Sequence, residues 1–315
     1  LDDPTRDKSL AYLQAVAFGL PAAVLFQSLR CHTQGIGIMH PFALASVIGF
    51  CANIPLNYAL IYGRWGAPEM GAAGCGWATA ISMWLGPVLI AFYIARSKSL
   101  RPYLPPLRLV APNLASIGEI CRLGLPIGCT FFLEIGLFSV IALLIATLGN
   151  TAMAAHQIAI NIWDVVYMPL ISIGSAMATR VGHAIGSGDR DRVTLAVWCG
   201  TSITLAVGFA CMLVLLTAPG LIISAYTSDP AINQIAINLI RLAAVFIIID
   251  SVQVAASFCL RAFKDTRFPF VVMCVVYWLI TLPLGYWLGI VTADDALSGT
   301  AGFWKSMILG IALSS

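Results

Sequence analysis

The chain has 315 residues, of which 60% are hydrophobic and 10% are charged, and its mean hydropathy is +0.92. A soluble domain carries about 25% charged residues, so this composition excludes an ordinary soluble protein and predicts membrane-spanning helices. The formal charge of +3 comes without a basic segment interleaved with aromatic residues, so nothing favours nucleic-acid binding. The nine cysteines are scattered without a Cys-x-x-Cys spacing, which disfavours a disulfide framework or a thiolate metal site.

Nine hydrophobic segments follow one another along the chain, and each is long enough to be a membrane span. In chain order they cover residues 10–30, 41–62, 71–95, 123–147, 152–178, 193–217, 238–260, 268–290 and 299–315. The fifth continues to residue 185 and contains Pro169 and Gly174, so we expect a kink or an extension into water there. The predicted fold class is an all-α, polytopic bundle of membrane helices.

The connections between these segments alternate in charge. Twelve of the seventeen basic residues lie in or beside the connections on one side of the bundle. They are Arg30, Arg96, Lys98, Arg101, Arg108, Arg122, Arg180, Arg190, Arg192, Arg261, Lys264 and Arg267. The positive-inside rule places this side in the cytoplasm. The longest connection, 97–119, contains four prolines and is the predicted cytoplasmic linker between two lobes.

An internal repeat supports this division, because several residues recur at a constant offset of 228 positions. Pro41, Pro55, Leu56, Tyr58, Gly71, Ala73 and Gly74 recur as Pro269, Pro283, Leu284, Tyr286, Gly299, Ala301 and Gly302. The span at 123–147 has no partner inside the chain. We therefore expect a twelve-helix protein of two parallel six-helix lobes, of which this chain is a fragment truncated at both ends. Residues 1–96 would end the N-lobe and residues 120–315 would form the C-lobe.

Three carboxylates interrupt long apolar runs: Glu134, Asp164 and Asp250. At ~1.5 Å per residue, each lies roughly 16–20 Å from a polar edge, near the midplane of a ~30 Å hydrocarbon core. An ionisable group there costs on the order of 2.5–3.5 kcal/mol, and such groups mark ion or substrate pathways. Three of them predict such a pathway here.

Helical spacing places polar side chains beside these acids. One stripe has the spacing i, i+4, i+7 and i+10, and the other i, i+3 and i+7. Their members are Gln157, Asn161, Asp164 and Tyr167 in the first stripe, and Asp250, Gln253 and Ser257 in the second. Polar stripes on apolar helices face a bundle interior or a water-filled cavity, because lipid offers no hydrogen-bond partners. A cation-binding cavity and interhelical packing contacts are both compatible with them.

The free-energy cost of burying a carboxylate falls when it takes up a proton or pairs with a cation, either Na⁺ or an organic ammonium. If the two exclude each other, entry of the ion displaces the substrate, which is antiport. Aromatic side chains near the acids, including Phe246, supply cation–π faces or plain packing. His156 lies a few residues inside its span, and we expect a role at a helix cap or at the membrane interface. No cofactor beyond the coupling ion is indicated.

Several stretches carry a specific resemblance. They are Asn53–Tyr58 (NIPLNY), Phe131–Phe138 (FFLEIGLF), Ala154–Asn161 (AAHQIAIN), Arg180–Gly186 (RVGHAIG) and Asp250–Val254 (DSVQV). Together they resemble the multidrug and toxic compound extrusion (MATE) family, in its NorM-like bacterial branch, and the resemblance covers nearly the whole chain. It implies helices four to twelve of a twelve-helix transporter in the bacterial inner (plasma) membrane, acting as a monomer.

The resemblance also implies export of small cationic amphipathic drugs, driven by Na⁺ or H⁺ through alternating access. Glu134 and Asp250 match the family's C-lobe acids and are the expected Na⁺ or H⁺ site. Phe246 stands where the Na⁺-coupled members carry a tyrosine. Asp164 stands where many members have a small polar residue, so we expect it to be an added cation-binding acid in the same cavity as Glu134 and Asp250. These two departures leave the identity of the coupling ion open.

Three alternatives stay open. A lipid-linked oligosaccharide flippase of the same superfold would favour Arg and Lys in the cavity, whereas the basic residues here lie mostly in loops. An intramembrane enzyme would use Glu134 and Asp250 as an acid/base pair, but no further His or metal-ligand pattern accompanies them. The third alternative is that the truncated chain is inactive by itself.

Overall fold

The structure, a computed structural model, describes residues 3–97 and 113–315. It divides into two compact units, Leu1–Ala111 and Pro112–Ser315, and each is described by itself. Within the described residues there are nine helical spans long and apolar enough to cross a membrane, and no strand. The predicted all-α, polytopic membrane fold is confirmed. Most of the predicted linker, residues 98–112, lies outside the described residues.

The first unit contains α1 (Asp3–Ala17), α2 (Leu20–Gly35), α3 (His40–Tyr62) and α4 (Gly71–Arg96). The first two form one interrupted span, Arg6–Gly35, where the sequence predicts a span over 10–30. Helix α4 packs against the other three helices of the unit. Its contact face is made of small residues such as Gly74, Gly76 and Ala78, which let neighbouring backbones approach closely.

The second unit contains six further spans. Its helices are α5 (Leu114–Ala146), α6 (Asn150–Gly186), α7 (Arg190–Thr217), α8 (Pro219–Ser224), α9 (Pro230–Ala262), α10 (Arg267–Met273), α11 (Leu282–Tyr286) and α12 (Ala296–Ser314), with π-helical segments η2 (Cys274–Thr281) and η3 (Trp287–Val291). The elements from α10 to η3 are consecutive and form a single span, Arg267–Val291. Two-thirds of the chain thus folds as one bundle.

Two helix boundaries have clear local causes. Helix α5 begins at Leu114, inside the range predicted for the linker, because the Asn113 side chain accepts a hydrogen bond of 3.0 Å from the Ala115 N–H and caps the helix. Helix α6 runs unbroken through Pro169 and Gly174. Its 37 residues correspond to about 56 Å, well beyond a ~30 Å hydrocarbon core, so its length fits the expected extension into water.

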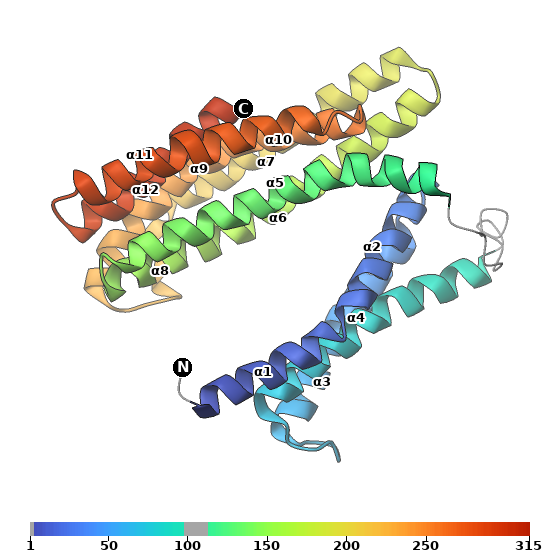
Figure 1. Cartoon of the computed structure of the whole chain (residues 1–315), viewed down its shortest axis with the longest axis horizontal. Helices are drawn as coiled ribbons and strands as arrows, with labels where there is room; N and C mark the ends of the chain where they lie inside the picture. Colours follow the sequence, from blue (N-terminus) through green and yellow to red (C-terminus); the bar gives the residue numbers. More distant parts are fainter. Residues whose placement is uncertain (1–2, 98–112) are drawn as a thin grey trace. The chain divides into compact units, whose positions relative to one another are not determined.

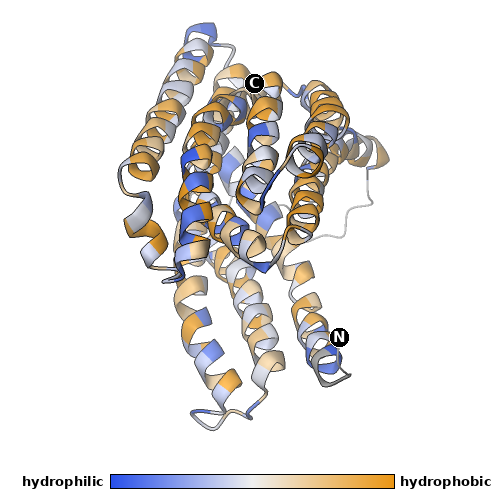
Figure 2. Ribbon diagram, turned by 90° about the vertical axis from the view of Figure 1, so that its left-hand side faces the viewer, coloured by the Kyte–Doolittle hydropathy of each residue, from blue (hydrophilic) through white to orange (hydrophobic). Residues whose placement is uncertain are grey.

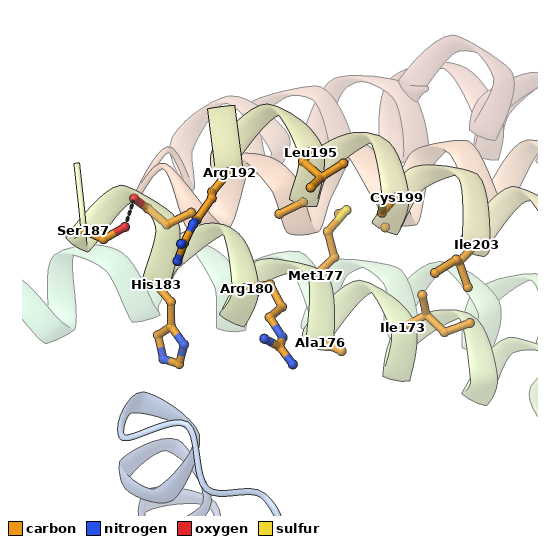
Figure 3. Close-up of a pocket in the computed structure, with 13 residues that line it drawn as sticks. Ile173, Ala176, Met177, Arg180, His183, Ser187, Arg192, Leu195, Cys199 and Ile203 are labelled. Carbon is orange, nitrogen blue, oxygen red and sulfur yellow. Dashed lines mark hydrogen bonds between the residues drawn. The ribbon is translucent and has the colours of Figure 1, made fainter. Parts of the chain in front are cut away.

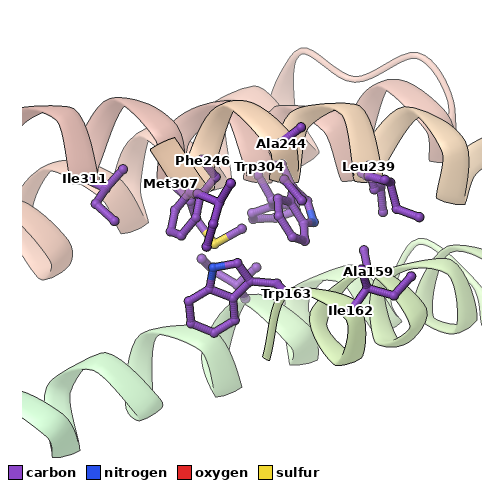
Figure 4. Packing of buried hydrophobic residues seen from close by; sticks show 14 of the residues in the cluster. Ala159, Ile162, Trp163, Leu239, Ala244, Phe246, Trp304, Met307 and Ile311 are labelled. Atoms are coloured by element: carbon purple, nitrogen blue, oxygen red, sulfur yellow. The ribbon is translucent and has the colours of Figure 1, made fainter. Parts of the chain in front are cut away.

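Helix α9 is the centre of the second unit. It packs against α6, α7, α8 and α12, and it contributes more buried residues than any other described helix of this unit. Aromatic side chains from three helices meet beside it: Trp163 of α6 and Phe246 of α9 lie edge to face at 5.8 Å, and Phe246 meets Trp304 of α12 at 6.3 Å. Figure 4 shows these three rings among aliphatic side chains of the same core. The middle of α9 is therefore held from several sides.

The internal repeat has a counterpart in the packing. Gly74 of α4 lies against the carbonyl group of Leu60 in α3, so close that an added Cβ would overlap it. Gly302 of α12 lies in the same way against the carbonyl group of Leu288. Both members of the second pair are 228 positions after those of the first. The repeated residues thus build the same backbone-to-backbone contact in each unit.

The connections of the second unit fall at its two ends. In Figure 1 the α6–α7 and α9–α10 connections lie at one end of the bundle, and the α5–α6 connection and the turn before α12 lie at the other. Basic residues gather at the first end, as predicted: Arg190 and Arg192 follow α6, and Lys264 and Arg267 follow α9. Hydrophobic colours dominate the long helices in Figure 2. We call the first end the basic end.

Candidate functional site

Asp250 is one of the most deeply buried charged residues of the described chain. It lies in the middle of α9, and 1% of its surface is exposed. Its Oδ2 atom and Nε1 of the neighbouring Trp163 are both buried; the indole N–H interacts with the carboxylate but the pair does not reach full hydrogen-bond geometry, and neither atom has another partner among the described residues. A buried carboxylate held by so weak a contact is costly, and a proton or a cation lowers that cost.

Glu134 of α5 interacts electrostatically with Asp250, and it is half-buried. Tyr167 of α6 interacts with the Glu134 carboxylate, and Tyr277 of η2 interacts with both acids. Four separate spans therefore contribute one side chain each to a group that we call the carboxylate cluster (Glu134, Tyr167, Asp250 and Tyr277). Two acids and two phenol hydroxyls offer oxygen atoms, which are the ligands that hard cations such as Na⁺ and H⁺ prefer.

Arg261 closes the cluster toward the basic end of the unit. It lies eleven residues after Asp250 on α9 and interacts with Glu134. Its guanidinium is held between two rings, 4.7 Å from the centroid of Phe258 and 5.0 Å from that of Phe131. A fixed positive charge therefore already lies near one of the two acids.

Two members of the cluster, Glu134 and Tyr167, border a small cavity of about 20 Å³ that Asp250 and Tyr277 do not line. Glu134, Tyr167, Gln253, Ser257 and Arg261 are among the residues that line it. A space of about 10–15 Å³ on this measure holds one water molecule, so the cavity fits a water molecule or a bare monovalent ion and not an organic drug. The polar stripe predicted along α9 faces this cavity through Gln253 and Ser257.

The stripe predicted along α6 does not enter this cavity as a unit. Tyr167 faces the carboxylate cluster, whereas Gln157, Asn161 and Asp164 are exposed on the surface of the second unit. Asn161 accepts a hydrogen bond of 2.8 Å from the hydroxyl of Tyr226. Asp164 thus belongs to a different face of α6 from the one that meets Glu134 and Asp250.

Phe246 lies one turn before Asp250 and is 3% exposed. Its ring belongs to the aromatic core with Trp163 and Trp304. It therefore supports the segment of α9 that carries Asp250 and offers that acid no oxygen ligand.

His156 is placed differently from our expectation of a cap or interface role. It is 1% exposed, and its Nδ1 atom accepts a hydrogen bond of 3.2 Å from Nε1 of Trp304. The reason is that α12 packs over this turn of α6 and brings the indole N–H to it. The expectation was wrong, because His156 joins two helices inside the core.

The sequence interpretation missed Tyr277 and Arg261. Arg261 had a usable signal, since a separation of eleven residues is close to three helical turns and places it on the same face of α9 as Asp250. Tyr277 had none, because it comes from another span whose π-helical segment sets the direction of its side chains. Among the described residues there is no group of three or more His, Cys, Asp or Glu side chains suited to a metal ion.

A family model and two curated relatives, both multidrug resistance proteins, match this chain. The family model MatE matches residues 126–287. The multidrug resistance protein PmpM of Pseudomonas aeruginosa is 40% identical over 306 residues, which cover 96% of this chain and 64% of that protein. The multidrug resistance protein NorM of Vibrio cholerae is 37% identical over 318 residues, covering 100% of this chain and 69% of NorM. The chain therefore spans about two-thirds of the length of these relatives.

Solved structures agree on the fold. The crystal structure of the eukaryotic MATE transporter AtDTX14 superposes with a TM-score of 0.87 at 20% identity, and covers 96% of this chain and 66% of that one. At this identity the likeness concerns the fold alone.

Proposed function

The chain belongs to the MatE family, and we propose from this premise that it serves ion-coupled export of small cationic, amphipathic drugs as part of a monomeric secondary transporter. It is a multi-pass protein of the bacterial inner membrane, with nine apolar spans among its described residues. In this proposal residues 1–96 form the end of the N-lobe, residues 97–119 the linker and residues 120–315 the C-lobe. The relatives PmpM and NorM are multidrug resistance proteins, which supports drugs as the substrates.

The observation that supports the coupling step is the burial of the Asp250 carboxylate beside Glu134, where the indole N–H of Trp163 is a neighbouring donor and no cationic side chain pairs with it among the described residues. A carboxylate in this position is stabilised by H⁺ or Na⁺, and the cavity of about 20 Å³ that Glu134, Tyr167 and Gln253 line fits either of them. Tyr167 and Tyr277 supply hydroxyl groups to complete the coordination. We assign the coupling ion to Glu134 and Asp250, with Gln253 as a supporting polar residue.

Asp164 is better placed to meet the drug than to bind the coupling ion. It lies with Gln157 and Asn161 on an exposed face of α6, outside the ion-sized cavity. Exposed amide and carboxylate groups within a span suit a water-filled passage large enough for an organic cation. We therefore assign these three residues to the substrate passage, with Asp164 attracting the positive charge of the drug.

The test is ethidium efflux from energised cells that express the transporter, its Asp250→Asn variant or an Asp191→Asn control. We expect Asp250→Asn to reduce efflux to the level of cells without the transporter, because an amide cannot exchange a proton or neutralise Na⁺. Asp191 is exposed in the first turn of α7, so its variant retains efflux. Normal efflux by Asp250→Asn would make Asp250 a packing residue, and no efflux by any of the proteins would favour the flippase alternative.

A further inference from the structure

A second cavity lies between α6 and α7, at the basic end of the second unit and outside the carboxylate cluster. Its volume is about 520 Å³, within the range of sites that bind small molecules. Side chains of both helices line it, and Figure 3 shows Arg180 and His183 projecting from α6 on the same side while Arg192 reaches toward α6 from α7. We call this cavity the α6–α7 groove.

Apolar side chains form most of the wall of the groove. Ile173 and Met177 come from α6, and Leu195 and Ile203 come from α7. Met177 packs directly on the backbone of Gly200, which has no side chain to fill the floor. Leu195 is 63% exposed and Ile203 is 53% exposed. In a membrane span, apolar surface of this kind meets hydrocarbon, so the wall suits an acyl chain.

Positive charge is concentrated at one end of the groove. Arg180 has no hydrogen-bond or ion-pair partner among the described residues. Arg192 has one acidic partner, with 3.0 Å between its Nε and Oδ2 of Asp189. Asp189 also accepts a hydrogen bond of 3.0 Å from the Arg192 N–H, so it serves as the cap of α7. The guanidinium of Arg180 is therefore left to bind an anion from outside the chain.

An anionic phospholipid has both the negative charge and the apolar chain that would match the arginines and the apolar wall of the groove. A phosphodiester suits a guanidinium, because paired N–H groups match its oxygen atoms, and an acyl chain suits the apolar wall. Basic pockets between membrane helices on the positive side bind the headgroups of anionic lipids. A cationic drug would meet like charge at this site, which separates the groove from the substrate passage proposed above.

We propose that the α6–α7 groove binds an anionic phospholipid from the leaflet at the basic end. The phosphodiester contacts Arg180 and Arg192, and the upper part of one acyl chain lies along Met177 and Leu195. The bound lipid joins the end of α6, which extends past the hydrocarbon core, to the first turns of α7. This site acts independently of the ion at Asp250.

Cys199 provides a direct readout, because it is exposed and lines the groove. The experiment uses the purified chain in detergent with Cys199 as its one remaining cysteine, and it measures the rate at which a maleimide labels that thiol. The probes are dioctanoyl phosphatidylglycerol, dioctanoyl phosphatidylcholine and inorganic phosphate. We expect phosphatidylglycerol to slow labelling at concentrations at which the other two probes leave the rate unchanged.

Two matched variants test the contact with the headgroup. Arg180→Gln should raise the phosphatidylglycerol concentration needed for half protection by about tenfold, because it loses a charged hydrogen bond. Arg180→Lys keeps the charge and should restore part of the protection. Arg190→Gln removes the same charge at an exposed residue that does not line the groove. In this variant the phosphatidylglycerol concentration that half-protects Cys199 should equal that of the parent protein.

Three results would overturn the proposal. Equal protection by phosphatidylcholine would show an apolar groove without headgroup recognition. Protection by inorganic phosphate alone would identify a site for a soluble anion. An equal loss of Cys199 protection in Arg180→Gln and Arg190→Gln would show that phosphatidylglycerol responds only to the overall charge of the surface. None of these readouts depends on drug efflux, so their outcome is separate from that of the transport test.

Discussion

Asp250 and Asp164 have the same side chain, but their surroundings differ. Asp250 is 1% exposed and lies in the tightly packed middle of α9, whereas Asp164 is exposed on α6. The first loses its hydration, which a proton or a cation would offset, and the second keeps access to solvent. This difference in burial is the reason for proposing the ion at one acid and the drug at the other.

The contact between His156 and Trp304 gives a prediction at the scale of single residues. Trp304→Phe should lower the free energy of unfolding by about 1–3 kcal/mol, because it leaves Nδ1 of the buried His156 without its donor. Unfolding in mixed detergent micelles, followed by fluorescence, measures the change. Trp198→Phe is the control, since Trp198 is 68% exposed. Equal losses in the two variants would mean that the hydrogen bond contributes nothing specific.

At the scale of helices, the existence of the spans could be predicted and their rotation could not. Hydropathy located all nine, and spacing showed that Gln157, Asn161, Asp164 and Tyr167 lie along one side of α6. A stripe of this width covers a broad arc of the helix. Tyr167, at one edge of this stripe, faces Glu134 of α5 and Asp250 of α9, while the other three residues are exposed on the surface of the second unit. Which part of an arc is covered depends on neighbouring helices, and periodicity in one segment carries no information about them.

The paired glycine contacts give a prediction for helix packing. Gly74→Ala and Gly302→Ala should each lower the free energy of unfolding by about 1–3 kcal/mol, because the new methyl group would overlap a backbone carbonyl that cannot move aside. Thermal unfolding of the purified variants in detergent measures the effect. Gly118→Ala is the control, since no atom lies within 4 Å of its added Cβ. It should be neutral or stabilising by up to about 1 kcal/mol. Unchanged stability in both test variants would contradict the contact.

At the scale of the whole molecule, the distribution of basic residues predicts the orientation in the membrane. Single cysteines at Ser187, in the α6–α7 connection, and at Ser228, before α9, mark opposite ends of the second unit. In spheroplasts, an impermeant maleimide should label Ser228→Cys directly and Ser187→Cys only after permeabilisation, because connections rich in Arg and Lys remain in the cytoplasm. The reverse pattern would show that these charges do not determine the orientation.

The duplicated contact between glycine and carbonyl has a mechanical consequence. Two helices that touch through their backbones have no flexible side chains between them to absorb sliding, so each pair moves as one stiff body. The pair α3–α4 in the first unit and the pair η3–α12 in the second are such bodies. A transporter that changes shape must then place its bending elsewhere, in the segments that lack this contact. The repeat thus contains one stiff helix pair in each unit, at equivalent positions of the sequence.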